Sequence, residues 1–407
     1  MKKYILIYKL FKVGQVCIIL TIFISSTYKP EWGFFSHRLI NKMAVYTLPQ
    51  QLLRFYKPHI GFITESAVNP DMRRYATKYE AMRHYMDIDH WDTIPFKKIP
   101  RNFEEALVKF SSFYLISTSG DSIKLKIQFN ELDSTLNIGF LNTNHNIKKK
   151  DFMGFITQEL MPLFYEDEIK VSSLKFNYWL KNNLIDSDKF PTIVLKDEFT
   201  DFGILPYYIE QGYNKLVKAY VNKNKDQILR HAADLGHYVG DLHTPLHTVA
   251  NYNGQMTDQV GIHPFWESRV PELFALEEYD FFVGKAVYID DVRKYIWDIL
   301  TDTHIKAAVV LNVEKELSKQ FPPDKQWCFD VRLDQTVRIQ CREYAKAYQN
   351  ALKGMVEEQM TKTIKTTGDL WYTAWIDAGS PDLRKLDKNP LPEEKIITDP
   401  NLKVREY

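Results

Sequence analysis

Apolar residues recur at helical spacing over most of the chain. This period of three to four residues runs over 32–89, 204–242, 265–318 and 340–377, with glycines and prolines at several of the joints. Apolar residues with that spacing fall on one side of a helix and can be buried together. The pattern therefore predicts a mainly α protein whose helices build the main core.

A different pattern occupies residues 111–200. Short runs of alternating apolar and polar residues, such as 122–129, 135–140 and 168–176, are separated by clusters of asparagine, aspartate and lysine. Alternation with a period of two is typical of strands that bury one face. We therefore expect an inserted, partly β segment between two stretches of helix.

Beyond residue 26, these changes of pattern divide the chain into three parts. A helical domain is expected to be discontinuous, formed by 27–110 and 201–380, with the partly β segment 111–200 inserted in it. The remaining residues, 381–407, are rich in charged residues and proline and poor in large apolar residues. Such a composition buries little apolar surface, so this tail is expected to be extended or poorly ordered.

The first 26 residues have the features of a secretory signal peptide. Four lysines and no acid precede residue 14, and a largely apolar run over 16–24 follows, ending in small residues. Small side chains favour cleavage, which is expected near Ser26 or Thr27. The apolar run is shorter than the roughly twenty residues that a membrane span needs. We therefore expect a secreted or periplasmic protein rather than one anchored in a membrane.

Composition and charge narrow the class of protein further. The 407 residues are 45% hydrophobic, enough for a large buried core, and their formal charge is +1. A balance this even gives no whole-chain attraction to nucleic acid or to an anionic membrane. After loss of the signal peptide two cysteines remain, Cys328 and Cys341. Both a disulfide between them and two buried free thiols are compatible with the sequence.

Candidate metal ligands gather in one stretch of the chain. His237 and Asp241 lie four residues apart, so on a helix their side chains leave the same face one turn apart. His247 follows a proline that turns the chain back, and His263 and Glu267 repeat the four-residue spacing. Imidazole and carboxylate are ligands that Zn²⁺ accepts, and two such pairs indicate more than one ion.

Further candidates lie upstream, where Asp71 and His84 flank an arginine- and tyrosine-rich segment and Trp32 and His37 follow the signal peptide. A single His–Asp pair on a helix is more often a surface or hydrogen-bonded pair, but the combination of pairs favours a metal centre. The other histidines lack a partner at ligand spacing or fall on another face. We expect His231 and His243 to be structural, and four others to be ordinary surface or core histidines: His59, His90, His145 and His304.

Together these residues resemble the zinc-dependent phospholipase C and S1/P1 nuclease superfamily. Its pattern is His-x-x-x-Asp, a histidine six residues after the Asp, a later His-x-x-x-Asp or Glu, and an N-terminal Trp with a nearby His. The matching residues are Trp32, His37, Asp71, His84, His237, Asp241, His247, His263 and Glu267. The resemblance covers most of 32–108 and 204–276. It implies a multi-helix phospholipase C/P1 nuclease-like domain in which the intervening segment is an insertion.

The resemblance also implies a cluster of three zinc ions. The implied ligand sets are Asp71, His84, His237 and Asp241 for one ion, His247, His263 and Glu267 for a second, and Trp32, His37 and Asp241 for a third. In the family the Trp binds through its α-amino nitrogen and carbonyl oxygen, so Trp32 would have to be the mature N-terminus. The predicted cleavage leaves several residues before it. Three ions are therefore expected, or two if the Trp32 site does not form.

The implied activity is hydrolysis of a phosphodiester by a zinc-activated water, with Asp71 as the catalytic carboxylate. A glutamate at the last ligand position, here Glu267, is typical of the phospholipase C branch. It favours a phospholipid substrate, which would imply transient contact with a membrane surface. The close spacing of Trp32 and His37 is more like the nuclease branch. A nuclease or 3′-nucleotidase acting on nucleic acid is therefore the alternative, and a zinc-stabilised binding protein without turnover is a further one.

Other residues near these positions have two interpretations. Arg73, Arg74 and Arg83 could hold phosphate or pair with acids. A set of aromatic residues could form an apolar rim for acyl chains, stack on bases, or belong to the core. These are Phe34, Phe35, Tyr75, Tyr85, Tyr252, Phe265 and Trp266.

Overall fold

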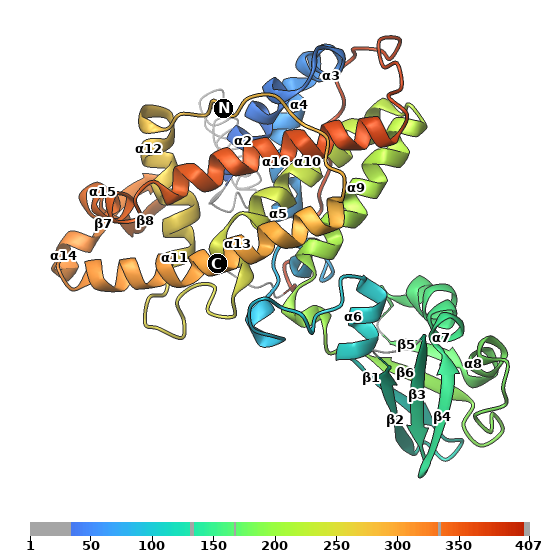
Figure 1. Cartoon of the computed structure of the whole chain (residues 1–407). Coiled ribbons are helices and arrows are strands. Elements are labelled where there is room, and N and C mark those ends of the chain that lie inside the picture. The colour runs from blue at the N-terminus through green and yellow to red at the C-terminus, as the bar shows by residue number, and fades with distance from the viewer. Residues whose placement is uncertain (1–33, 131–133, 167, 333–334, 403–407) are drawn as a thin grey trace, which may run out of the picture.

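The computed structural model describes residues 34–130, 134–166, 168–332 and 335–402 (Figure 1). The predicted signal peptide and Trp32 lie outside the described residues. A helical body occupies most of the molecule, and a smaller unit with a sheet is attached at one end of it. The mainly α class is confirmed, with the addition of an antiparallel sheet. Among the described helices, none is both long and apolar enough to cross a membrane.

Long helices form the frame of the body. They are α2 (Phe34–Thr47), α9 (Leu205–Val221), α10 (Lys225–Leu242), α13 (Val292–Ser318) and α16 (Met355–Asp377). Helix α10 lies at the centre and packs against α2, α9 and α16. Shorter helices complete the body: α3 (Gln50–Tyr56), α4 (Ile60–Glu65), α5 (Asn69–Arg73), α12 (Val270–Glu278), α14 (Pro323–Gln326) and α15 (Arg342–Ala351).

The sequence of α10 explains both its bounds and its burial. Asn224 precedes the helix, and its side chain accepts a hydrogen bond from the backbone N–H of Gln227, which caps the first turn. The helix ends at Leu242, three residues before Pro245. From Leu235 onward every residue of α10 is buried. Its last two turns therefore place polar ligands inside the protein.

The inserted unit is built on a six-stranded antiparallel sheet. In chain order its strands are β1 (Ser112–Ile116), β2 (Ser122–Phe129), β3 (Thr135–Phe140), β4 (Thr143–Lys148), β5 (Ile169–Ser172) and β6 (Thr192–Lys196). They are arranged in the order β4-β3-β2-β1-β6-β5. Phe113 on β1 lies opposite Leu125 and Leu195, and all three are buried. Helices α6 (Phe103–Phe110), α7 (Lys149–Phe155) and α8 (Ser173–Leu180) accompany the sheet.

One strand prediction in this unit was wrong in part. The pattern over 168–176 predicts a single strand, but the strand ends at Ser172 and α8 begins at Ser173. The side chain of Ser172 accepts a hydrogen bond from the backbone N–H of Leu174 and so caps the helix. A local cap therefore overrides the alternating pattern.

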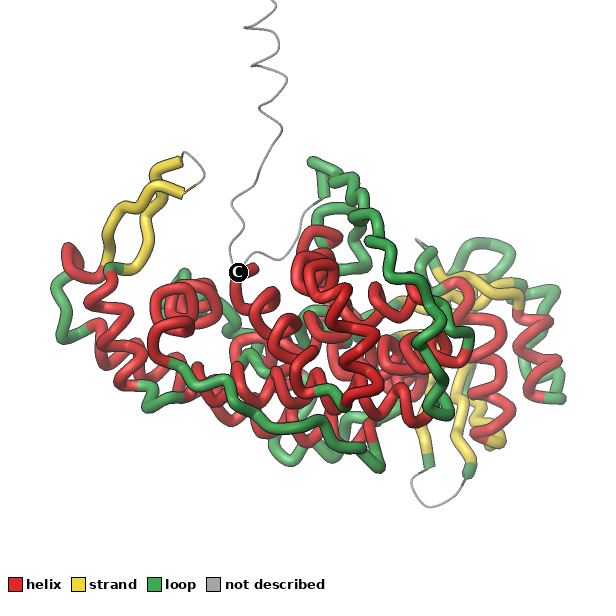
Figure 2. The backbone as a smooth tube through the Cα atoms, turned by 90° about the horizontal axis from the view of Figure 1, so that it is seen from above, coloured by secondary structure: helices red, strands yellow, loops and turns green. Residues whose placement is uncertain are grey.

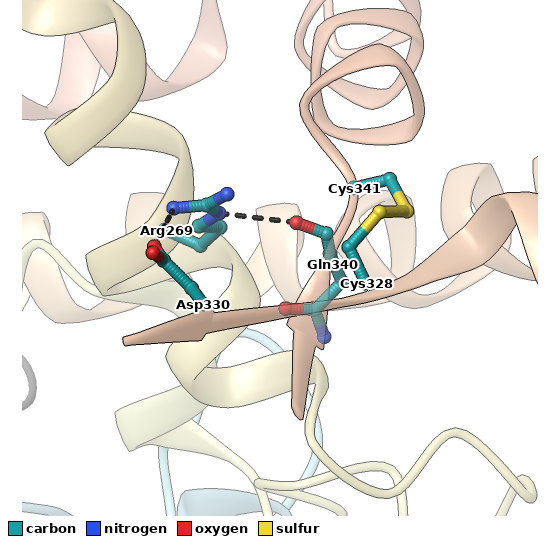
Figure 3. Close-up of a disulfide and its surroundings, with 5 residues drawn as sticks. All are labelled: Arg269, Cys328, Asp330, Gln340 and Cys341. Carbon is teal, nitrogen blue, oxygen red and sulfur yellow. Dashed lines mark hydrogen bonds and ion pairs between the residues drawn. A yellow bond between two sulfur atoms is a disulfide. The ribbon is translucent and has the colours of Figure 1, made fainter. Parts of the chain in front are cut away.

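A β-hairpin projects from the opposite end of the body, formed by β7 (Trp327–Arg332) and β8 (Gln335–Gln340) (Figure 2). Its base carries a disulfide between Cys328 and Cys341, so the disulfide alternative holds (Figure 3). Arg269 contacts the hairpin through its Nε, which donates to the carbonyl of Gln340 at 3.1 Å. The helical pattern of the sequence did not predict this element.

The described part of the C-terminal tail, residues 381–402, forms no helix or strand. It nevertheless contacts the helical body. Leu383 is buried, and Lys225 on α10 pairs with Asp387 at 2.6 Å. The position of this part of the tail on the body is defined by these specific contacts.

Candidate metal centre

Eight of the nine predicted ligands come together in the helical body, and Trp32 lies outside the described residues. Their ligand atoms form overlapping groups in which all members lie within 4.8 Å of one another. The contributing elements are α2 with His37, α5 with Asp71, the residue after η3 (Ala81–Arg83) with His84, α10 with His237 and Asp241, η8 (Pro245–Thr248) with His247, α11 (Ile262–Pro264) with His263, and the π-helix η9 (Phe265–Arg269) with Glu267.

The first group consists of His84, His237 and Asp241. His84 Nδ1 lies 3.1 Å from His237 Nε2 and 3.0 Å from Asp241 Oδ2. His237 Nε2 lies 3.4 Å from the same carboxylate oxygen. Asp71 Oδ1 borders the group at 3.7 Å from His84 Nδ1 and 3.8 Å from His237 Nε2. Two nitrogens and two carboxylates therefore converge on one point.

The second group consists of His247, His263 and Glu267. The Nε2 atoms of the two imidazoles are 3.2 Å apart. Glu267 Oε2 lies 2.9 Å from His263 Nε2 and 3.5 Å from His247 Nε2. His263 and Glu267 are four residues apart and meet here, although His263 lies on α11 and Glu267 on the π-helix η9.

The third group, His37, Asp241 and Glu267, lies between the other two. His37 Nε2 is 3.6 Å from Asp241 Oδ1 and 3.5 Å from Glu267 Oε1. Asp241 thus directs Oδ2 to the first group and Oδ1 to His37 and to His247, whose Nε2 is 3.7 Å away. Its carboxylate is in the position of a bridge between groups.

Hydrogen bonds to the backbone orient three of the imidazoles. The pairs are His237 Nδ1 with the carbonyl of Ala67 (2.8 Å), His247 Nδ1 with that of His84 (2.5 Å) and His263 Nδ1 with that of Tyr252 (3.0 Å). A carbonyl oxygen can only accept, so each Nδ1 carries the proton and each Nε2 presents a lone pair. The Nε2 atoms are the ones that face the carboxylates, as in a histidine metal site.

Burial controls the charge of these groups. It holds the pKa of His84 and of His237 well below the ordinary value and lowers that of His247 to about 4. It raises the pKa of Asp241, and the nearby carboxylate of Asp71 adds to that effect. Burial also opposes ionisation of Glu267, but its contacts with His247, His263 and His37 outweigh it and lower the pKa. Burial therefore favours the neutral form of His84, His237 and His247.

A bound cation fits this set of donors. Asp241 Oδ2 is buried and makes no hydrogen bond to any described residue, which is costly for a carboxylate in the interior. Five imidazoles and three carboxylates share the space, and imidazole together with carboxylate is the donor set of a divalent metal site. The centre can therefore hold metal ions, and more than one group is available.

The sequence left two interpretations of Arg73, Arg74 and Arg83: they hold phosphate, or they pair with acids. Arg73 and Arg83 pair with the buried carboxylate of Glu80, at 3.7 Å and 2.5 Å, and so have structural partners. Arg74 is different, because its Nη1 lies 3.4 Å from Asp71 Oδ1 at the edge of the centre. Arg74 therefore also pairs with an acid, one that belongs to the centre.

Three of the seven candidate aromatic residues and two of the remaining histidines take structural places. Tyr85, Phe265 and Trp266 are buried among core residues. His243 is buried, and its Nε2 lies 3.1 Å from the hydroxyl of Thr366. His304 contacts the backbone carbonyl of Thr248 at 3.1 Å. These contacts agree with the roles expected for the two histidines.

One residue of the site was missed by sequence reasoning. Glu80 is fully buried, accepts a hydrogen bond from the hydroxyl of Tyr238, and places Oε1 3.9 Å from His84 Nε2. That nitrogen has no hydrogen-bond partner among the described residues, so Glu80 is the nearest acceptor behind His84. The four-residue spacing of Glu80 and His84 was the signal that could have found it.

Comparison with known proteins gives no family for this chain. No protein-family model matches the sequence, and no curated protein matches it either. The chemistry of the centre is therefore argued from its own residues.

Proposed function

We propose that this protein is a zinc-dependent phosphodiester hydrolase of the phospholipase C type. The observation that carries the proposal is the carboxylate of Asp241, which faces the first group with one oxygen and His37 and His247 with the other. A shared carboxylate between histidine groups is the arrangement needed to hold two or more ions close together. Clustered ions are suited to a phosphodiester because substrate and hydroxide are both anionic.

Zinc ions held there would neutralise phosphate oxygens and lower the pKa of a water to about 7. Asp71 is the most exposed carboxylate of the centre, with 19% of its side chain accessible, against 2% for Asp241 and 13% for Glu267. It orients the attacking water and accepts its proton as the oxygen bonds to phosphorus. The ester P–O bond breaks, and the proton passes on to the leaving oxygen. Arg74 beside Asp71 pairs with a phosphate oxygen.

A phospholipid is the substrate class that we propose. Glu267 occupies the last ligand position, as in the phospholipase C branch of the family that the sequence resembles. Exposed apolar side chains also lie on segments next to the centre. Gly261, two residues before His263, faces the ring of Trp327, and on the same strand Phe329 and Val331 are 76% and 69% exposed. Such residues can contact the surface of a lipid aggregate.

The fold and the processing belong to the same proposal. We assign the helical body to a phospholipase C/P1 nuclease-like domain in which the sheet unit is an insertion. Secretion would remove the signal peptide, and a further cut before Trp32 would complete the third ligand set with His37 and Asp241. Zinc content and the N-terminal mass of the secreted protein test this together. Three ions with Trp32 first would support it, and two ions with a longer N-terminus would limit the centre to the described groups.

The activity is tested with the zinc-loaded protein and two kinds of substrate. One assay measures diacylglycerol released from vesicles of phosphatidylethanolamine and phosphatidylglycerol, and the other measures nucleotide released from single-stranded DNA and from a 3′-nucleotide. Chelated protein and a His263→Ala variant serve as controls. Diacylglycerol release supports the proposal, whereas nucleotide release alone would assign the nuclease alternative. Tight zinc with no turnover in either assay would indicate a binding protein.

A further inference from the structure

The C-terminal tail crosses the helices that carry the metal ligands. Its described residues are attached at several points between Asp387 and Asp399. The contacts are Lys225 Nζ with Asp387 (2.6 Å), Arg230 Nη2 with the carbonyl of Pro392 (3.0 Å), Arg73 Nη1 with Glu394 (3.1 Å) and the backbone N–H of Asp399 with the carbonyl of Tyr75 (2.7 Å). The tail therefore joins α10 to α5 and to the residues that follow α5.

Glu394 makes the central contact. Its Oε2 accepts hydrogen bonds from Asn69 Nδ2 at 3.3 Å and from Arg73 Nη1 at 3.1 Å, and its Oε1 lies 3.3 Å from the same guanidinium nitrogen. Asn69 and Arg73 are the first and last residues of α5, and Asp71 is the middle one. One carboxylate of the tail thus holds both ends of the short helix that presents Asp71.

The helix needs such support because it is only five residues long. No side chain caps its N-terminus, and a single helical turn is not stable in isolation. Arg73 also pairs with Asp234 on α10 at 2.9 Å and with Glu80 at 3.7 Å. The pair with Asp234 joins α5 to α10, the pair with Glu80 joins it to the segment before His84, and Glu394 contacts the same guanidinium from the tail.

We propose that Glu394 is a positioning residue that holds the α5 turn so that Asp71 faces His84 and His237. Only the expected effect on kcat depends on the proposed hydrolysis; the expected effect on the structure of α5 does not. Asp71 Oδ1 is 3.7 Å and 3.8 Å from the two imidazoles. A displacement of about 1 Å at a reacting group can cost roughly a hundredfold in rate. The tail would then contribute to the geometry of the centre through Glu394.

Glu394→Gln removes the charge while it keeps the shape of the side chain. Arg73 retains Asp234 and Glu80, so the fold should survive the change. The matched control is Glu393→Gln, because Glu393 is the exposed neighbour in the same segment. Far-ultraviolet circular dichroism and thermal unfolding establish that both variants are folded.

The first readout does not need activity. Hydrogen exchange of the backbone amides over 69–75 should be faster in Glu394→Gln than in Glu393→Gln, in zinc-loaded protein. The second readout is kinetic: kcat for diacylglycerol release should fall about tenfold to a hundredfold, with KM within about twofold. Glu394→Asp, which keeps the charge, should recover part of both effects.

The outcomes separate the two proposals. Faster exchange over 69–75 with no hydrolysis even in the unaltered protein would keep the role of Glu394 and refute the proposed function. Equal exchange in the two glutamine variants would refute the positioning role whatever the activity. An equal loss of kcat in both variants, or a loss that follows only a general loss of stability, would also refute it.

Discussion

Two glycines on α10 determine how closely α2 can approach it. A Cβ at position 236 would meet the side-chain oxygen of Asn41 at 1.9 Å, and one at position 240 would meet the ring of His37 at 2.7 Å. Both contacts are shorter than real Cβ atoms show, so only glycine permits them. Gly240 lies directly before Asp241. Because it has no side chain, His37 of α2 can approach Asp241 of α10.

Gly240→Ala is therefore expected to push the ring of His37 away from the centre. Overpacking of this kind costs about 1–3 kcal/mol of unfolding free energy, and zinc affinity should fall because His37 is displaced. Urea unfolding of the metal-free protein and a chelator competition measure the two effects. Gly212→Ala is the control, because a Cβ there meets only Leu235 at 3.6 Å and gains helix propensity of up to about 1 kcal/mol. Equal stability of the two variants would contradict the packing argument.

Asp71→Asn separates metal binding from turnover. His84, His237 and Asp241 remain, so much of the zinc should stay bound, whereas the amide cannot accept a proton from water. Loss of a general base typically costs about a hundredfold to ten-thousandfold in rate. Metal analysis and kcat for diacylglycerol release are measured together, with Asp226→Asn on the exposed start of α10 as the control. Full activity at normal zinc content would show that Asp71 is not the base.

Helices and strands whose formation depends on residues close to one another in the sequence were predictable. The strands Ser122–Phe129 and Thr135–Phe140 have the bounds that the alternating pattern gave, and the long helices fall within the predicted ranges. The ligand pair on α10 and the pair formed by His263 on α11 and Glu267 on η9 follow from their four-residue spacing. In contrast, the convergence of His37 and Asp71 with them was implied only by a family resemblance, because spacing does not bring distant segments together.

The β7–β8 hairpin shows why other elements were missed. Its two strands have six residues each, as β3 does, but its contacts with the body are made by Arg269, which comes from another part of the chain. A two-stranded hairpin is at best marginally stable alone. Its sequence therefore carried too little local signal to compete with the helical patterns on either side.

The hairpin also provides a test of the lipid substrate. Phe329→Asp combined with Val331→Asp places charge on the exposed strand without changing the centre, so hydrolysis of vesicle lipid should fall while hydrolysis of a soluble short-chain phospholipid is kept. The two activities are compared as a ratio. The control is Tyr178→Asp, since Tyr178 is 80% exposed on α8 in the sheet unit. An unchanged ratio in the double variant would remove the hairpin from any role in lipid contact.

At the scale of the whole molecule, the centre lies where two hydrophobic cores meet. One core contains the apolar residues of α9, α10 and the sheet unit, and the other contains those of η9, α12 and α15, while α13 contributes residues to both. Asp241 comes from a helix of the first core, and Glu267 from an element of the second. Metal ions bound by both residues would join the two cores. Loss of the ions would leave the carboxylates of the centre close together without a cation.

Removal of metal should therefore destabilise the protein as a whole and loosen the junction first. Binding to the folded state alone adds about 2.7 kcal/mol at a free ligand concentration of 100 Kd and about 4.1 kcal/mol at 1,000 Kd. Scanning calorimetry with zinc or chelator measures this, and hydrogen exchange locates it, with the largest increase expected over 262–269. In His263→Ala the chelator should have a smaller effect, because the second group has already lost a ligand. Equal unfolding temperatures with and without chelator would mean that the cores are joined by packing alone.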